Sequence, residues 1–136
     1  MPTTDDHLAL ARRNKATIDY LLRARDDHFE WIATVAFYAA LHFVEAVFFS
    51  DDGRHGRNHE NREHILKSTR RYQQLHRHYR PLWQASVIAR YMGRSNSDAA
   101  LLFRDYMSPD EVEAKLVRHH LVKIEQSATR LIENRK

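Results

Sequence analysis

Apolar and polar positions alternate along this chain with the spacing of amphipathic helices, except in one segment that is apolar on nearly every side. That segment, FEWIATVAFYAALHFVEAVFF, runs from Phe29 to Phe49. A helix that is apolar all round is expected at the centre of a bundle. Asp26 and Asp27, just before it, carry the negative charge that favours a helix N-terminus. The pattern therefore predicts a buried central helix over residues 28–49.

Helical periodicity on both sides of this segment predicts the rest of a bundle. A first helix is expected over about residues 5–23, capped by Thr4 or Asp5. A third helix is expected to start near Asn58, after the turn that ends the central helix, and to reach Tyr72. Each has apolar positions on one side, so each is expected to pack against the central helix.

The last third of the chain contains the clearest boundary. Ser108 and Glu111 have the spacing of a capping box, which predicts a long C-terminal helix over residues 109–134. A shorter helix is expected to begin near Pro81, because proline is tolerated in a first turn, and residues 93–97 are expected to form a loop. The apolar positions of the C-terminal helix form one packing seam: Ala114, Val117, Leu121, Ile124, Ala128 and Leu131.

Composition supports a helical fold and narrows the possible chemistry. The chain has only three Gly and three Pro, which disfavours an all-β fold. It has no Cys, which excludes disulfides, thiolate metal ligands and cysteine nucleophiles. Residues 1–136 are therefore predicted to form a single all-α domain, an antiparallel bundle of four to five helices.

The central helix is also long enough to cross a bilayer, so a membrane protein is the alternative. Glu30, His42 and Glu45 lie in or near the apolar run. An acidic side chain at the centre of a bilayer costs about 2.5–3.5 kcal/mol. The N-terminal sequence MPTTDDHLALARR lacks the pattern of a signal peptide. We therefore expect a soluble cytoplasmic protein with no membrane partner.

The positive charge is concentrated after the central helix. Between Arg54 and Arg80 there are seven Arg, one Lys and five His, against only Glu60 and Glu63. A basic face on an otherwise mixed surface favours a polyanionic partner, with RNA or a nucleotide ahead of an acidic protein. The alternative is a solvated helix face that is rich in arginine.

Three polar residues of the central helix share one face. Tyr38, His42 and Glu45 stand at positions i, i+4 and i+7. They could form a hydrogen-bonded relay in which Glu45 orients His42 and raises its pKa, behind a site in the basic segment. The alternative is that these polar groups satisfy one another in the core.

The spacing of the histidines predicts no metal site and no cofactor. His59 and His64 are five residues apart, whereas the zinc-protease motif places two histidines four apart on one helix face. His76 and His78 are two apart, and His119 and His120 are adjacent, so neither pair chelates from one α-helix.

Three segments form a recognisable combination: an aromatic- and Ala-rich helix at Phe37–Ala46, a histidine-bearing loop at His55–His64 and the sequence SVIARY at Ser86–Tyr91. Together they resemble the HEPN superfamily of small all-α proteins. The resemblance extends from about Ala9 to Glu133. It implies a HEPN-like helical bundle, RNA or nucleotide binding, and a homodimer whose cleft forms between two protomers.

Many HEPN proteins are metal-independent ribonucleases of toxin or defence type, with an Arg and then a His after four to six intervening residues. Arg57-Asn58 with His64 fits this spacing, and Arg54 with His59 fits it too. The resemblance implies His64 as general base, Arg57 as phosphate clamp and Asn58 as the residue that orients them. The remaining nucleic-acid contacts are then expected from Arg54, His59, Arg62, Arg70, Arg71 and Arg77.

The family also contains proteins that have lost this motif, which gives a second functional hypothesis. Such chains act as interaction modules, as adaptors or as toxin–antitoxin partners of a nucleotidyltransferase-like protein. The motif here lies between the second and third helices, whereas in the family it usually opens a later helix. A non-catalytic HEPN module is therefore the alternative to the ribonuclease.

Overall fold

The computed structural model describes residues 2–92 and 99–135. Within these ranges the chain forms helices and turns and has no strand, which confirms the all-α prediction for the described part. The loop expected at residues 93–97 lies outside the described residues.

The first two helices form a hairpin. Helix α1 spans Thr4–Leu21 and is capped by Thr3, one residue before the predicted cap, in a capping box with Asp6. A short 3-10 turn, Leu22–Ala24, leads into α2, Arg25–Asp52. Helix α2 is interrupted at His28, where φ is −132° and ψ is 18°. It ends at Gly53, which has a φ of +69°, a left-handed conformation that glycine adopts without strain.

The next region differs from the prediction in where its helices break. Helix α3 spans His59–Ser68 and is capped by Asn58, as expected. It stops because Thr69 is extended, and a 3-10 turn over Arg70–Tyr72 then leads into α4, Gln73–Val87. The helix predicted to begin near Pro81 therefore begins eight residues earlier. Proline inside a helix removes one backbone hydrogen bond, and here the packing of α4 on the core outweighs that loss.

The C-terminal helix is continuous but not uniform. After the π-helical turn η3 (Ile88–Met92) and α5 (Ala99–Tyr106), Ser108 and Glu111 form the predicted capping box. The helix then runs through α6 (Pro109–Glu111), a π-helical segment η4 (Val112–Leu121) and α7 (Val122–Arg135).

The π-helical segment shifts the packing face away from the predicted seam. A π-helix closes i→i+5 hydrogen bonds, so its side chains recur after more residues than the 3.6 of an α-helix. Val112 and Leu116 are buried here, whereas Ala114, which α-helical spacing placed in the seam, is exposed. Leu121, Ile124 and Ala128 are buried as predicted, whereas in the last turn Ile132 is buried in place of the predicted Leu131.

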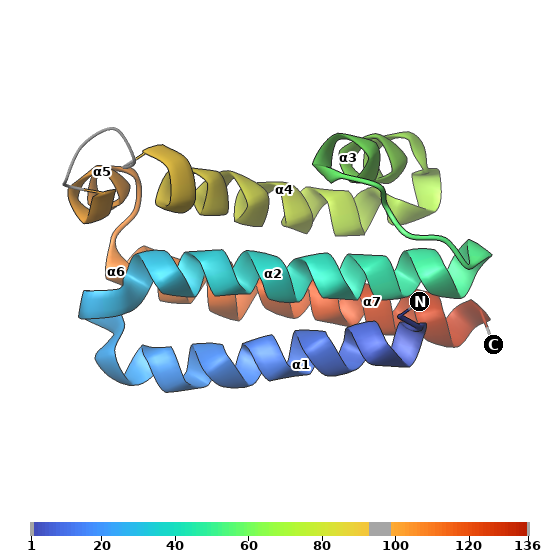
Figure 1. Cartoon of the computed structure of the whole chain (residues 1–136), viewed down its shortest axis with the longest axis horizontal. Helices are drawn as coiled ribbons and strands as arrows, with labels where there is room; N and C mark the ends of the chain where they lie inside the picture. Colours follow the sequence, from blue (N-terminus) through green and yellow to red (C-terminus); the bar gives the residue numbers. More distant parts are fainter. Residues whose placement is uncertain (1, 93–98, 136) are drawn as a thin grey trace.

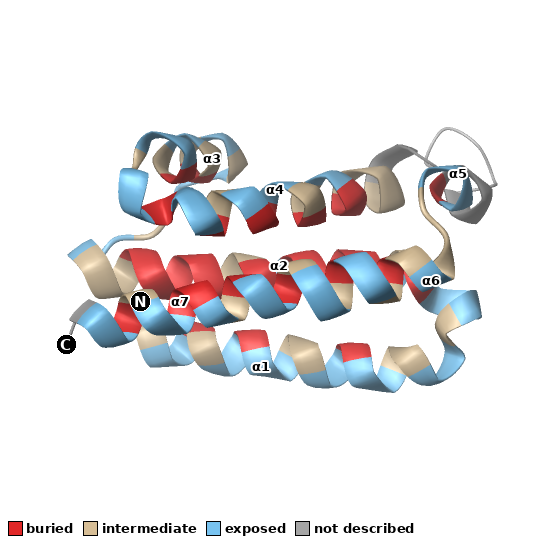
Figure 2. Cartoon of the chain, turned by 180° about the vertical axis from the view of Figure 1, so that it is seen from behind, coloured by how far each residue is buried: buried red, intermediate tan, exposed pale blue. Residues whose placement is uncertain are grey.

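The long helices α1, α2, α4 and α7 lie lengthwise beside one another, with α2 in the middle, whereas α3 and α5 run across them (Figure 1). Helix α1 and the C-terminal helix pack on α2, α4 covers another side of it, and α3 lies across the end where α2 stops. Seen from behind, the buried residues face inward along α2 and α7 (Figure 2). Most side chains of the predicted central helix are buried, which confirms its place in the core.

One stretch, Thr4–Asp52, contains a window long and apolar enough to cross a membrane. Within the protein, 72% of that window is already buried against other helices. An apolar window that is mostly covered by neighbouring helices is typical of the core helix of a bundle.

Candidate functional site

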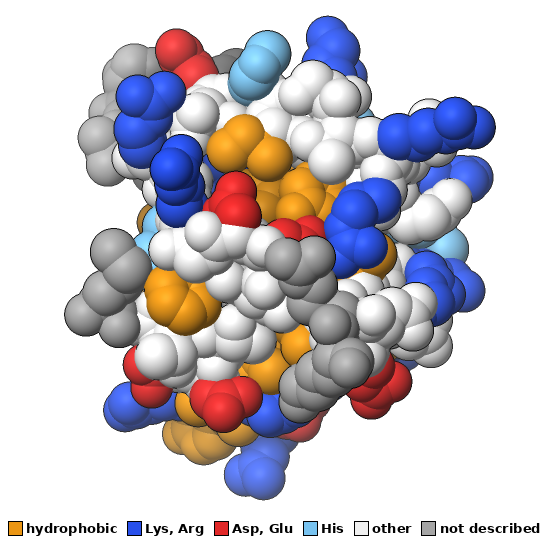
Figure 3. All heavy atoms as spheres, turned by 90° about the vertical axis from the view of Figure 1, so that its right-hand side faces the viewer, with side chains coloured by type: hydrophobic (Ala, Val, Ile, Leu, Met, Phe, Trp, Pro, Cys, Tyr) orange, Lys and Arg blue, Asp and Glu red, His pale blue; other side chains and the backbone are white. Residues whose placement is uncertain are grey.

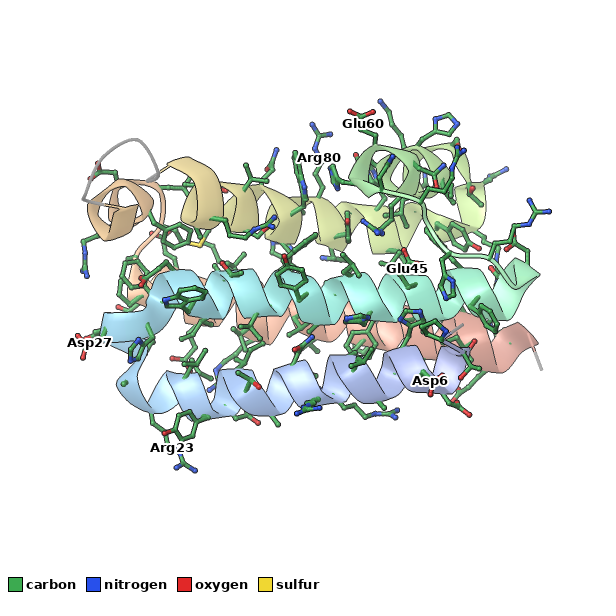
Figure 4. The ribbon with its side chains drawn as sticks, in the orientation of Figure 1. Asp6, Arg23, Asp27, Glu45, Glu60 and Arg80 are labelled. Carbon is green, nitrogen blue, oxygen red and sulfur yellow. The ribbon has the colours of Figure 1, made fainter. Side chains whose placement is uncertain are left out.

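A buried ion pair joins the end of α2 to the basic segment. Arg62 of α3 donates from Nε to Glu45 Oε1 at 2.8 Å, and both side chains are buried. The backbone N–H of Gly56 also donates to the Glu45 carboxylate, at 3.0 and 3.2 Å. In Figure 4, Glu45 points from α2 toward α3, whereas Glu60 points outward. One carboxylate therefore fixes both the loop after α2 and helix α3.

Gly56 is required by the close approach of this loop to α2. A Cβ atom at position 56 would lie 2.9 Å from Glu45 Oε1 and 3.3 Å from Arg62 Cβ. A side chain there would displace the carboxylate or the arginine. Glycine is thus the residue that allows the loop to reach Glu45.

A cavity of about 450 Å³ opens beside this pair. Its polar wall contains Arg54, His55 and Arg57 from the loop, and one carboxylate, Asp52, also lines it. The remaining lining residues are Phe48, Asn61, Ile65 and Tyr72. Figure 3 shows this end of the molecule, where Lys and Arg side chains surround an area in which apolar side chains are visible. We call this pocket the junction cavity.

The residues predicted as a catalytic trio have different environments. Arg57 is exposed and lines the junction cavity, and its backbone N–H donates to Asn61 Oδ1 at 2.9 Å. Asn58 uses its side chain to cap α3, accepting from Asn61 N at 2.8 Å. His64 is exposed on α3 and is not among the lining residues, although its neighbour Ile65 is.

Of the other residues predicted to contact nucleic acid, some are exposed and others pack against or bind neighbouring side chains. Arg54, Arg70 and Arg77 are exposed. Arg71 is also exposed, but it binds Asp51 with Nε and Nη2 at 3.0 and 2.8 Å. The engaged residues are Arg62, described above, and His59, whose ring stacks on Trp83 at 4.1 Å.

The predicted relay in α2 is not a hydrogen-bonded chain among the described contacts. Tyr38 accepts from Arg90 Nη1 at 3.1 Å, and Glu45 binds Arg62 and Gly56. His42 instead faces His7 of α1, with their Nδ1 atoms 3.1 Å apart.

His7, His42 and His55 form a cluster behind the junction cavity. The rings of His7 and His55 meet edge to face, with centroids 4.8 Å apart. Burial, then the proximity of His42 and His55, lowers the pKa of His7. Burial also lowers the pKa of His42, against the opposing effect of Glu45, so the relay's expected rise in this pKa does not occur. The rings of His7 and His42 are therefore expected to be neutral at neutral pH.

A second cluster brings together His78, His119 and His120, which the spacing analysis treated as unable to chelate. One ring nitrogen from each of these residues lies within 4.8 Å of the other two. Burial lowers the pKa of His78, and it lowers that of His120 to about 4. Among the described residues, these three could hold a metal ion.

Sequence reasoning missed the structural role of Glu45 and the place of His55. A carboxylate inside an apolar helix requires a buried partner, and Arg62 shares a helix face with the apolar Leu66 four residues later. That combination was the available signal. No signal in the sequence indicated that His55 would line a cavity.

No family model, curated protein or solved structure matches the chain.

Proposed function

We propose that this chain is an RNA-binding protein of HEPN type, with the junction cavity as its binding site. The observation that carries the proposal is the position of Arg54 and Arg57, both exposed and both lining a cavity of about 450 Å³. That volume is in the range of small-ligand sites. Guanidinium groups suit phosphate because they offer paired N–H donors.

The chemistry of the cavity wall favours a nucleotide unit over a simple anion. Phe48, Ile65 and Tyr72 give one part of the wall an apolar character, while the two arginines give another part a positive charge. A nucleotide carries both an apolar base and a charged phosphate. Single-stranded RNA presents such units with their bases free to enter a pocket.

We further propose that the bound RNA is cleaved without a metal ion. His64 would take the proton of a ribose 2′-OH, whose oxygen then forms a bond to the adjacent phosphorus as the bond from phosphorus to the 5′ oxygen breaks. The departing 5′ oxygen would take a proton from water. Arg57 would stabilise the charge on the phosphoryl oxygens, and Asn58 would support the start of α3. His64 is exposed to solvent on α3 but does not line the cavity itself, so this role rests on the resemblance and on the RNA reaching His64 from the cavity.

The binding proposal is tested with a pair of charge-matched variants. Arg54→Ala/Arg57→Ala should weaken binding to a labelled single-stranded RNA by at least about tenfold and reduce its salt dependence by one to two phosphate contacts, roughly 0.7 log units per contact. The control is Arg12→Ala/Arg13→Ala, which removes the same charge from exposed positions on α1. Equal losses in the two variants would show nonspecific attraction and would contradict the junction cavity as the site.

Cleavage is tested separately, with the same RNA in EDTA. His64→Ala should abolish cleavage while leaving RNA affinity within about twofold, because a general base contributes to the reaction rather than to binding. Sedimentation of the protein with and without RNA tests the expected homodimer. Self-association without RNA binding would favour the alternative, an interaction module for a nucleotidyltransferase-like or other protein.

A further inference from the structure

Three imidazoles from two helices meet on the side of α4 that faces the C-terminal helix. His78 belongs to α4, and His119 and His120 belong to η4, which packs against α4. His78 Nδ1 and His120 Nδ1 are 3.0 Å apart. The ring of His119 lies 5.4 Å from that of His78 and 4.8 Å from that of His120. We call this group the interhelical histidine cluster.

The π-helical conformation of η4 makes adjacent histidines usable together. In an α-helix neighbouring side chains diverge by about 100°. With roughly 4.4 residues per turn, a π-helix reduces this angle to about 82°. His119 and His120 therefore turn toward the same region of α4, and π-helical turns are frequent at functional sites.

The nitrogen positions lie close to those of a tetrahedral metal site and would need only small ring movements to reach them. A zinc ion bound by imidazoles at 2.0–2.1 Å places its ligand nitrogens about 3.3 Å apart. Here the closest pair is 3.0 Å apart, and all three ligand atoms lie within 4.8 Å of one another. Two N–H groups cannot point at each other over 3.0 Å, so at least one nitrogen of the pair presents a lone pair.

A cation bound at this cluster would be held by the lone pairs of the imidazoles and not by carboxylate charge. None of the three rings pairs with a carboxylate among the described residues. His78 is buried, His120 is half-buried and His119 is exposed, so the site has a protein wall and a solvent entrance. Arg77 and Lys123 lie near enough to His78 to oppose positive charge there.

We propose that His78, His119 and His120 bind a divalent first-row transition-metal ion, Zn²⁺ above the others, with the fourth position open to water. Three neutral imidazoles with an open position are the ligand set of catalytic zinc sites. The site is separate from the junction cavity, and the proposal does not depend on RNA binding.

The test is a titration of the full chain, produced without a polyhistidine tag and dialysed against EDTA. Co²⁺ is added first, because its visible absorption reports tetrahedral coordination, and Zn²⁺ is then used to displace it. One equivalent of Co²⁺ with a tetrahedral spectrum, displaced by Zn²⁺, is the expected result. No binding at millimolar Co²⁺ and Zn²⁺ would overturn the proposal and leave only a hydrogen bond between two histidines.

Variants identify the ligands. His78→Ala, His119→Ala and His120→Ala should each lower Zn²⁺ affinity by at least about 100-fold, since removal of a supporting group outside the ligand set costs 10–100-fold. His119 is exposed, so its variant is expected to fold and keeps the test decisive if His78→Ala does not. The control is His76→Ala, on the same helix but paired with Glu63, which should change affinity by less than about twofold.

Two further results would contradict the assignment. Unchanged binding in all three ligand variants would exclude the cluster. Loss of binding in His7→Ala, with retention in the others, would place the ion in the cluster behind the junction cavity. A salt titration separates the two sites. Salt screens the repulsion between Zn²⁺ and the nearby Arg77 and Lys123, so Zn²⁺ affinity should rise with ionic strength, whereas RNA affinity should fall.

Discussion

The junction cavity and the interhelical histidine cluster both contain basic side chains, but the two regions differ in whether carboxylates pair with those side chains. Around the junction, carboxylates bind many of the basic side chains: Glu45 binds Arg62, Asp51 binds Arg71 and Glu63 binds His76. Arg54 and Arg57 remain exposed beside the cavity. In the interhelical cluster the rings contact one another, and no carboxylate pairs with them among the described residues.

This difference determines which ligand each region suits. Exposed guanidinium groups keep their charge at all physiological pH values and attract anions. Burial lowers the pKa of His78 and His120, and neutral imidazoles offer lone pairs that suit a cation. A count of basic residues therefore does not identify a partner; burial and the placement of carboxylates do. The following predictions test how far the two regions differ.

The largest effect is expected from the buried pair. Arg62→Ala leaves the Glu45 carboxylate buried without its charged partner and should lower the free energy of unfolding by about 3–5 kcal/mol. Urea denaturation followed by circular dichroism measures this change. The matched control is Lys115→Ala, which breaks the exposed pair with Glu111 and should cost less than about 1 kcal/mol. Similar losses in both variants would contradict the anchoring role of Glu45.

A smaller effect is expected at the glycine of the loop. Gly56→Ala places a Cβ 2.9 Å from Glu45 Oε1 and should destabilise the protein by about 1–3 kcal/mol, within the range for overpacking. The control is Gly53→Ala, where open space surrounds the Cβ and only the left-handed backbone opposes substitution. RNA affinity should fall in Gly56→Ala and remain near that of the native protein in Gly53→Ala.

The histidines behind the junction cavity predict a dependence of stability on pH. Burial lowers the pKa of His7 and His42, so below their ordinary value of 6.5 the unfolded chain binds more protons than the folded one. The stability that the folded protein gains from keeping these two histidines neutral is fully present above pH 6.5 and is lost as the pH falls below that value. We therefore expect the free energy of unfolding to decrease as the pH falls below about 6.5.

The attribution of this pH dependence is checked by substitution. His7→Gln should reduce the slope of stability against pH, although Asp6 and Glu45 partly oppose the effect by stabilising a positive His7. His28→Gln, at an exposed position, should leave the slope unchanged. An unaltered slope in His7→Gln would assign the titration to other groups.

The smallest effect is expected at the exposed ion pair of the basic segment. Arg71 binds Asp51 with two nitrogens, but its side chain is 43% exposed. Arg71→Ala should therefore change the free energy of unfolding by less than about 1 kcal/mol, and the change should shrink further in high salt. A loss as large as that of Arg62→Ala would show that exposure does not separate the two arginines.

The parts of the fold that could be predicted are those set by local rules. The central helix follows from its apolar composition, and the C-terminal helix follows from the capping box of Ser108 and Glu111. The predicted start of α4 near Pro81 was wrong because this proline is tolerated inside a helix that packs well on the core. The packing seam predicted for the C-terminal helix was partly wrong, because the prediction used α-helical spacing for a segment that is π-helical.

The candidate sites depended on contacts between distant segments, which local patterns do not encode. The sequence shows where arginines are concentrated, but it does not separate the buried Arg62 from the exposed Arg57. The pairing of His78 with residues more than 40 positions later requires the packing of α4 on the C-terminal helix. A search for chelating pairs within single helices could not find it.

The shared attachment of the loop and α3 to Glu45 also has a consequence for how this part of the molecule opens. Loss of the contacts to that one carboxylate would release Gly56 and Arg62 in the same event. Amide protons between these two positions and along α3 should therefore exchange with solvent together, at a common rate and below the threshold of global unfolding. A ligand seated in the neighbouring pocket would slow all of them at once.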